Sequence, residues 1–143
     1  MTRAEVERRL AEGQACALIW VGSDLAYHSW SSTRPTYLPY LGKTLRPRSE
    51  QVYVDLSFTA HAFRRRGIHQ TIAAQRLHDE WADGARAHLT LVAWWHQPSI
   101  RTFSRLGMTA VGSIGYWNLC GWHTYFVTGA VQLDSPSSFC VDA

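Results

Sequence analysis

The sequence predicts one domain of the α/β class (α+β), in which a mixed β-sheet carries helices on its faces. Helical and strand-like patterns follow one another in the order α-β-β-β-α-β-α-β-β. The strand–helix–strand–helix section in the middle implies parallel neighbours joined by a crossover. The 143 residues show no internal repeat and no linker, so we expect a single domain over residues 1–143, with an irregular tail over 134–143.

A short helix and a β-hairpin are expected at the start of the chain. Thr2 and Glu5 have the spacing of a capping box, in which the Glu5 side chain would reach back to the N-cap. The apolar run 16–21 predicts a buried strand, and 25–30 predicts its hairpin partner. The stretch 31–49 contains three prolines and a glycine without periodicity, so we expect a long loop there.

The second half of the chain alternates between strands and helices. Helical spacing predicts a helix over 67–83, and a second helix should start near Pro98 and end at Gly107. Gly112 and Gly115 interrupt one strand-like run, which suggests a bulge or a close backbone contact. The runs that predict strands are 51–59, 88–95, 109–119 and 122–133.

Composition and charge exclude several classes of function. The formal net charge is +3, and the arginine run 64–66 concentrates much of it in one place. A nucleic-acid-binding face needs basic residues spread more widely, so we expect a local anion site and no nucleic-acid partner. The three cysteines are far apart and form no C-x-x-C pair, which argues against a disulfide framework and a thiolate metal site. No segment has signal-peptide character or the ~20 apolar residues that span a bilayer, so we expect a cytoplasmic protein without membrane or metal partners.

The segment 58–70 joins a predicted strand to a predicted helix and has the features of an anion site. Backbone amides at a helix N-terminus are unpaired and carry partial positive charge, which suits a phosphate or pyrophosphate. Gly67 lets the backbone approach a ligand without a Cβ in the way. The run 64–66 adds guanidinium groups that pair with phosphates. A solvated basic turn explains this run, taken alone, about equally well.

Two motifs in this half of the chain resemble those of the GNAT superfamily of acetyl-CoA-dependent N-acetyltransferases. Arg64-x-x-Gly67-x-His69 after a strand is similar to that family's pyrophosphate-binding loop, Arg or Gln-x-x-Gly-x-Gly or Ala. After the next strand, the segment 96–108 resembles the second signature, which has an Asn, a small residue, an aromatic residue and a Gly. The resemblance covers about residues 21–127 and is strongest where both motifs occur in the expected order.

The resemblance implies a mostly antiparallel GNAT-like sheet with helices on both faces, in which the central strands 51–59 and 88–95 splay apart. The pantetheine arm of acetyl-CoA, or of another acyl-CoA, would lie in that gap. Trp94 and Trp95 should contact the arm or the acceptor, or else lie in the core. The cofactor-binding residues that the resemblance implies are Phe58, Thr59, Arg64, Arg65, Arg66, Gly67, Ile68, His69, Gln70, His96, Ser99 and Phe103.

The function that the resemblance implies is acyl transfer to a primary amine of a small molecule or a protein. Phe103 stands where many members have a Tyr that protonates the CoA thiolate, so that role is absent, falls to water, or passes to another group. A GNAT-like module that binds acyl-CoA without efficient turnover is therefore the alternative. His69 replaces a small residue, and His96 replaces the usual Asn. Only one helix precedes the hairpin, so the acceptor site is either open, covered by 31–49, or completed by a second subunit in a homodimer.

Three residues are candidate bases for the acceptor amine. Asp55 should share a strand face with Tyr53 and Ser57, and a carboxylate there could accept a proton from an ammonium group. A salt-bridged or surface aspartate is the alternative for Asp55. His28 and His123 are the other candidates.

Overall fold

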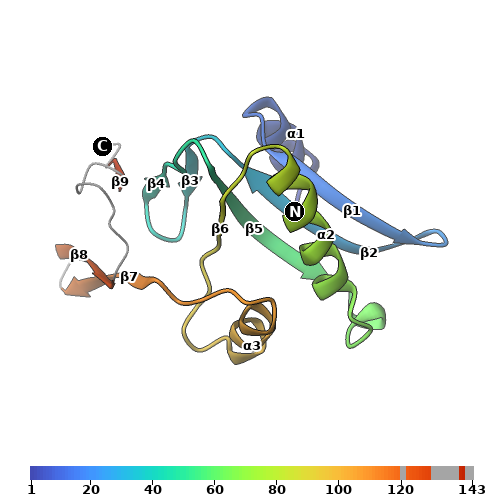
Figure 1. The fold of residues 1–143 in the computed structure, drawn as a ribbon. Coiled ribbons are helices and arrows are strands. Elements are labelled where there is room, and N and C mark those ends of the chain that lie inside the picture. Colours follow the sequence, from blue (N-terminus) through green and yellow to red (C-terminus); the bar gives the residue numbers. More distant parts are fainter. Residues whose placement is uncertain (120–121, 130–138, 141–143) are drawn as a thin grey trace.

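The computed structural model describes residues 1–119, 122–129 and 139–140 and has a four-stranded mixed sheet at its centre (Figure 1). The strand order is β1-β2-β5-β6; the first three strands pair antiparallel, and β5 and β6 pair in parallel. These strands are β1 (Ala15–Val21), β2 (Asp24–Ser32), β5 (Gln51–Thr59) and β6 (Ala87–Leu89). The predicted mixed, mostly antiparallel sheet is confirmed.

Helices cover both faces of this sheet, as predicted. The helical elements are α1 (Arg3–Ala11), the 3-10 turn η1 (His61–Phe63), α2 (Ile68–Ala82) and α3 (Gln97–Arg105). The Arg9 guanidinium of α1 lies 5.4 Å from the Trp30 ring centroid, whereas Arg76 Nη1 of α2 donates to Ser29 Oγ at 2.6 Å. Ser29 and Trp30 are neighbours on β2 and point to opposite faces, so α1 and α2 lie on opposite sides (Figure 1).

The N-terminal helix forms half of the predicted capping box. Thr2 is the N-cap, and its hydroxyl accepts from the Glu5 amide at 3.3 Å. The Glu5 carboxylate accepts from the side chains of Arg8 and Arg9 rather than reaching back to Thr2. Two nearby guanidinium groups attract a carboxylate more strongly than one neutral amide does, so the side chain turns along the helix.

The prediction of a buried first strand is wrong. In β1 the side chains of Leu18 and Trp20 are largely exposed. The strand lies at the edge of the sheet, and α1 is nine residues long, with its Arg9 over Trp30 of β2. Although β1 is rich in apolar residues, several of their side chains are therefore not covered by other described residues.

The stretch 31–49, which the sequence predicts as a loop, contains a hairpin that supplies core residues. Its strands are β3 (Thr36–Leu38) and β4 (Lys43–Leu45), and β9 (Phe139–Cys140) pairs with β4 inside the tail predicted to be irregular. The rest of that tail lies outside the described residues. Leu38, Leu41 and Leu45 form a buried cluster with Tyr53 of β5. The strands are too short to show alternation, which is why the sequence pattern missed them.

After β6 the chain leaves the sheet earlier than the sequence predicts. The predicted strand over 88–95 is wrong beyond Leu89, which is the last residue of β6 paired with β5. The predicted second helix, α3, is confirmed, with Pro98 in its first turn. The last two predicted strands form a separate ribbon of β7 (Gly112–Leu119), which starts three residues later than predicted, and β8 (Trp122–Gly129). Residues 130–133 of the second prediction lie outside the described residues.

Of the bulge or close backbone contact expected at Gly112 and Gly115, the β7–β8 register shows no bulge, and the close contact at Gly115 is with a side chain. A Cβ on Gly115 would lie 2.6 Å from the Phe126 ring, which sits opposite it on β8. An alanine there would force the ring to move.

We predict that the hairpin in 31–49 contributes to stability as a core element. Leu38 is 1% exposed, so Leu38→Ala should lower the free energy of unfolding by about 2–5 kcal/mol, measured by urea denaturation. The matched control is Tyr37→Ala in the same strand, because Tyr37 is 52% exposed and its loss should change stability little. If Leu38→Ala were as stable as the control, the stretch would be a loop that does not pack on the sheet.

Candidate functional site

A cleft opens where β5 and β6 separate. These strands pair only at Gln51–Ala87, Val52–His88 and Tyr53–Leu89. From Val54 to Thr59 the strand β5 keeps β2 as its neighbour on one side and has no β6 pairing on the other. The splay of the two central strands that the family resemblance implies is therefore present.

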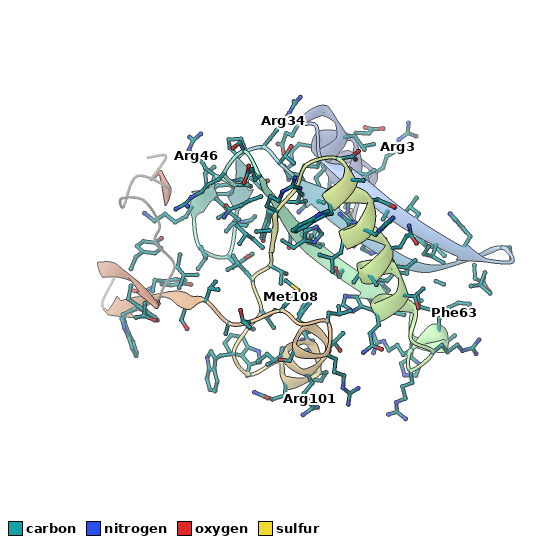
Figure 2. All side chains as sticks on the ribbon, in the orientation of Figure 1. Arg3, Arg34, Arg46, Phe63, Arg101 and Met108 are labelled. Atoms are coloured by element: carbon teal, nitrogen blue, oxygen red, sulfur yellow. The ribbon has the colours of Figure 1, made fainter. Side chains whose placement is uncertain are left out.

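The cleft lies on the α2 face of the sheet and is mainly apolar. Strands β2 and β5 form its floor with Tyr27, Val54 and Ser57. One wall is α2 and the other is α3, whose Phe103 lines the cleft; Met108, just beyond α3, does so as well (Figure 2). Side chains of β6 and the segment after it close the end where the strands meet. The cleft is small, with a volume of about 30 Å³, and side chains of α2, α3 and the sheet line it.

A bulge in β5 determines which side chains enter the cleft. Between the pairs His28–Phe58 and Trp30–Asp55, two residues of β5 lie opposite one residue of β2, and Leu56 has φ +45°. Ser57 therefore joins Val54 in the cleft, while Asp55 points to the α1 face. The prediction that Asp55 and Ser57 share a face is wrong, because the extra residue shifts the alternation by one.

The N-terminus of α2 lies at the end of the cleft away from β6 and has unpaired amides. Gly67 is the N-cap with φ +75°, provides no side chain to cap the helix, and no acidic residue follows in the first turn. The amides of Ile68, His69 and Gln70 therefore lack an intrahelical acceptor and share the positive end of the helix dipole. This arrangement favours an anion beside the cleft.

The three arginines before Gly67 are exposed and differ in their contacts. Arg64 Nε donates to the Thr59 carbonyl at 3.1 Å, and its guanidinium lies 5.9 Å from the Phe58 ring centroid, so it folds back onto the end of β5. Arg66 lies over Phe63, which is beside the N-terminal end of α2 (Figure 2). Arg65 has φ +62° and carries the chain through the turn.

The start of α3 forms the second motif of the sequence analysis. His96 is the N-cap, and its carbonyl accepts from the amides of Ser99 and Ile100. Neither His96 nor Ser99 lines the cleft, whereas Phe103 does. The Phe103 ring packs edge-on against His69 with 5.5 Å between ring centroids, so the first turn of α2 and the middle of α3 meet across the cleft.

Asp55 lies on the opposite face, paired with α1. Arg9 Nη2 lies 3.5 Å from Asp55 Oδ2, and the Arg9 side chain is only 7% exposed. Arg9 also donates to Glu5 and Gln14. The structure therefore places Asp55 in an ion pair at the point where β5 leaves β6.

Two tyrosines extend this polar cluster. The hydroxyls of Tyr53 and Tyr40 lie 3.3 Å apart. Burial, followed by the negative charge of Asp55, raises the pKa of Tyr53 above its ordinary value. Burial also raises the pKa of Tyr40. Both phenols therefore keep their protons at neutral pH and can act as hydrogen-bond donors.

No protein-family model and no curated protein matches the chain, but solved structures do. Aminoglycoside N-acetyltransferase AAC(6')-Iy, in complex with the bisubstrate analogue CoA-S-monomethyl-acetylneamine, matches 79% of this chain and 79% of its own, with a TM-score of 0.60 and 16% identity. AAC(6')-Ig from Acinetobacter haemolyticus matches 81% of this chain and 77% of its own, with a TM-score of 0.62 and 16% identity. A predicted acetyltransferase from Clostridium acetobutylicum, with acetyl-CoA, matches 76% of this chain and 66% of its own, with a TM-score of 0.54 and 9% identity.

The chain has the GNAT acetyltransferase fold. Identities of 9–18% show the fold alone, so the assignment of individual residues depends on this chain's own geometry. In this GNAT fold, α1 is the one described helix before β1, which leaves much of the face around β1 uncovered.

The two histidine candidates lie in different parts of the GNAT fold. His28 stands opposite Phe58 on the Asp55 face, and the two rings stack with 5.5 Å between centroids. Burial, helped by the positive chain terminus, lowers the pKa of His28, so its ring is uncharged at neutral pH. His123 lies on β8 opposite Asn118, in the separate ribbon. Geometry thus groups His28 with Asp55.

The cleft also contains side chains that the sequence analysis missed. Tyr27, Arg76 and His88 line it; Arg76 forms an ion pair with Glu80, and His88 Nε2 contacts the same carboxylate. The sequence signal that could have found Arg76 is the helical spacing of positions 69, 73 and 76, because residues three and four apart share one face of α2. Trp94 and Trp95, expected in the gap or the core, are exposed and pack edge-to-face on each other.

Among the described residues, no group of three or more His, Cys, Asp or Glu side chains could hold a metal ion. Within the same residues, no helix has the length and apolar character needed to cross a bilayer.

We predict that Arg9 stabilises the Asp55 face. Arg9→Gln should lower the free energy of unfolding by about 3 kcal/mol, because it leaves a partly buried carboxylate without its partner. Arg3→Gln is the control, since Arg3 is 92% exposed in its own ion pair with Glu7 and its loss should change stability little. Equal stability of the two variants in urea denaturation would contradict the structural role of Arg9.

Proposed function

We propose that the protein is an N-acyltransferase that moves an acetyl or another short acyl group from acyl-CoA to a primary amine. The observation that carries this proposal is the cleft between β5 and β6, which runs up to the unpaired amides of α2. At the α2 end of the cleft the amides would bind the phosphates of CoA. The apolar part of the cleft beside β5 would hold its pantetheine arm.

The pyrophosphate of CoA would lie on the amides of Ile68, His69 and Gln70, with Arg65 and Arg66 adding positive charge. Each hydrogen bond to a charged group contributes roughly 1.5–3 kcal/mol, so a few amides suffice to anchor a nucleotide. The arm would follow β5 past Phe58 and Thr59 and enter the cleft. The CoA and acetyl-CoA in structures with this fold support the choice of carrier.

The acceptor amine would approach from the α1 face, where Asp55 and His28 lie. One strand would then serve both reactants, because the bulge in β5 turns Ser57 to the cleft and Asp55 to the other side. AAC(6')-Iy and AAC(6')-Ig act on aminoglycosides, which supports a small-molecule amine as the acceptor. Asp55, directly or through water, would accept the proton that the amine must lose.

Binding of acyl-CoA without efficient turnover is the second candidate. Phe103 favours it, because its ring lines the cleft and has no proton to donate. A thermal-shift and mass-spectrometry screen with acetyl-CoA, longer acyl-CoAs and a panel of amines separates the two. Stabilisation by acyl-CoA without any acylated amine would support the binding module.

We predict that Gly67→Val weakens CoA binding. Gly67 has φ +75°, and a Cβ there would meet no other atom within 4 Å, so the cost of valine is backbone strain of about 1–2 kcal/mol. Any shift of the turn displaces the amides that would hold the pyrophosphate, so calorimetric CoA affinity should fall by at least about tenfold. Raised salt should also weaken binding in the wild type.

Gly22→Val is the matched control, because Gly22 has φ +61° and equally open surroundings in the β1–β2 turn. It should lose similar stability and keep its CoA affinity. Equal CoA affinity in the two variants would show that the pyrophosphate does not bind at the turn before α2.

We predict that Asp55→Asn lowers turnover by roughly 10²–10⁴-fold, the range for loss of a general base, while CoA affinity stays constant. The deficit should shrink at high pH, where more of the amine is already free. Asp24→Asn, at the exposed start of β2, is the control. Near-normal turnover in Asp55→Asn would exclude this base and direct attention to His28 and His123. A parallel loss of CoA binding would mean that Asp55 is structural.

A further inference from the structure

A second pocket, larger than the cleft, lies at the C-terminal end of α2, where the chain turns into β6 (Figure 1). Its volume is about 290 Å³, against about 30 Å³ for the cleft, and none of the described residues that line it also lines the cleft. Ser31 and Ser32 of β2 and Val52 of β5 form a buried floor, and the exposed residues Glu50 and Asp83 belong to the rim. This volume is close to the lower end of the range for small-molecule sites.

The floor of the pocket carries a buried hydroxyl without a partner. Ser31 is 8% exposed, and its side chain points to the α2 face, as that of Ser29 does. Among the described residues the Ser31 hydroxyl makes no hydrogen bond, whereas Ser32 Oγ accepts from the Arg34 amide and donates to the Arg34 carbonyl. Because buried polar groups are almost always paired, the Ser31 hydroxyl is free to bond to a molecule in the pocket.

The carboxylates around the pocket differ in their contacts. Glu80 lines the pocket but is already engaged, because it accepts from Arg76 at 2.7 Å and contacts His88. Glu50 and Asp83 form no ion pair with any described residue. Asp83 is also the C-cap of α2, at the negative end of the helix dipole and opposite the proposed anion site. Two carboxylates at the rim therefore remain free to bind a cation.

Two arginines lie near this rim without pairing with either free carboxylate. Arg86 Nη1 donates to the carbonyls of Trp81 and Ala85, so it is bound to the last turn of α2 and the residues after it. Arg34 packs on Gly13, where a Cβ would lie 2.6 Å from Arg34 Nη1. The described lining of the pocket itself contains no lysine, arginine or histidine.

We propose that this pocket binds a small hydroxylated ammonium compound. The ammonium group lies between Glu50 and Asp83, and a hydroxyl of the ligand bonds to Ser31 on the floor. The side chains of Thr33 and Ser49 at the rim provide further hydroxyl groups. Binding needs neither CoA nor acyl transfer, so this site is additional to the proposed function.

The test compares serinol, the amino analogue of glycerol, with glycerol itself. The two molecules differ in one group, an ammonium in place of a hydroxyl, so the comparison isolates the charge. Titration of serinol into isotope-labelled protein at neutral pH should shift the backbone amide signals of Ser31, Val52 and Asp83. Glycerol should bind at least about tenfold more weakly, and added salt should weaken the binding of serinol.

Variants of the pocket identify the groups that bind. The double variant Glu50→Gln with Asp83→Asn should lower serinol affinity by about tenfold, since each exposed ion pair contributes modestly. Ser31→Ala should lower it by about threefold to tenfold, and it should not lower the melting temperature because the hydroxyl has no partner to lose. Asp79→Asn is the matched control, because Asp79 is an exposed carboxylate of α2 that does not line the pocket.

Four results would overturn this inference. Equal affinity for glycerol would show that the ammonium group is not recognised, and unchanged affinity in the double variant would show that the two carboxylates do not hold it. Tighter binding of glycerate than of serinol would assign the pocket to an anion beside Arg34. If neither serinol nor glycerate shifts these amide signals, water alone satisfies the Ser31 hydroxyl. None of these results bears on the binding of CoA.

Discussion

Backbone pairing between β5 and β6 ends at Tyr53 and Leu89, and the position of the cleft follows from that. Tyr53 belongs to the buried cluster of Leu38, Leu41 and Leu45, and Leu89 packs against it. This packing holds the strands together up to the pair, and α3 forms the far wall of the gap beyond it. The unpaired groups of β5 face a space suited to a ligand that can hydrogen-bond to them. Side-chain packing beside the last β5–β6 pair thus fixes the point beyond which β5 has no β6 partner.

The bulge at Leu56 places Ser57 and Asp55 on opposite faces of the same strand. Without the extra residue, Asp55 and Ser57 would point the same way, and the cleft would lose a polar side chain on its floor. With it, the α2 face carries the channel and the α1 face carries the Asp55–Arg9 pair with the two tyrosines. The two reactants of an acyl transfer would then approach the gap between β5 and β6 from opposite faces of the sheet. Within the part of the chain that the structure describes, α1 lies over the Asp55 face, and its buried Arg9 contacts Glu5, Gln14 and Asp55.

The first turn of α2 combines electrostatics with sterics. Gly67 takes a left-handed conformation that presents the helix amides outward, and His69 turns its ring into the cleft. A small side chain at the position of His69 would leave the channel wider and without an imidazole. The same turn therefore provides the proposed anion site and places an imidazole ring in the lining of the cleft.

Local physical chemistry was sufficient to predict several elements from the sequence alone. The Thr2 cap, the β-rich strand 51–59, the α2 helix that begins after Gly67, and Pro98 in the first turn of α3 all depend on interactions within a few residues. Gly115 also indicated a close local contact, since a Cβ there would lie 2.6 Å from the Phe126 ring. These signals and the order of the elements predicted an α/β domain with a mixed sheet and an anion-binding turn before α2, whereas the GNAT-like fold and the position of Phe103 came from the resemblance of two motifs.

Only the tertiary structure decided the rest, because those features depend on partners distant in sequence. The hairpin in 31–49 is held by its leucines, which pack with Tyr53, and β6 ends at Leu89, after which the chain leaves the sheet. The exposure of β1 depends on how far α1 reaches, and the face on which Ser57 lies depends on one unpaired residue opposite Ser29. Arg76 and His88 join the cleft through α2 docking on the sheet. A sequence pattern indicates which residues favour burial or a turn. Which distant residue each of them packs against depends on the tertiary structure.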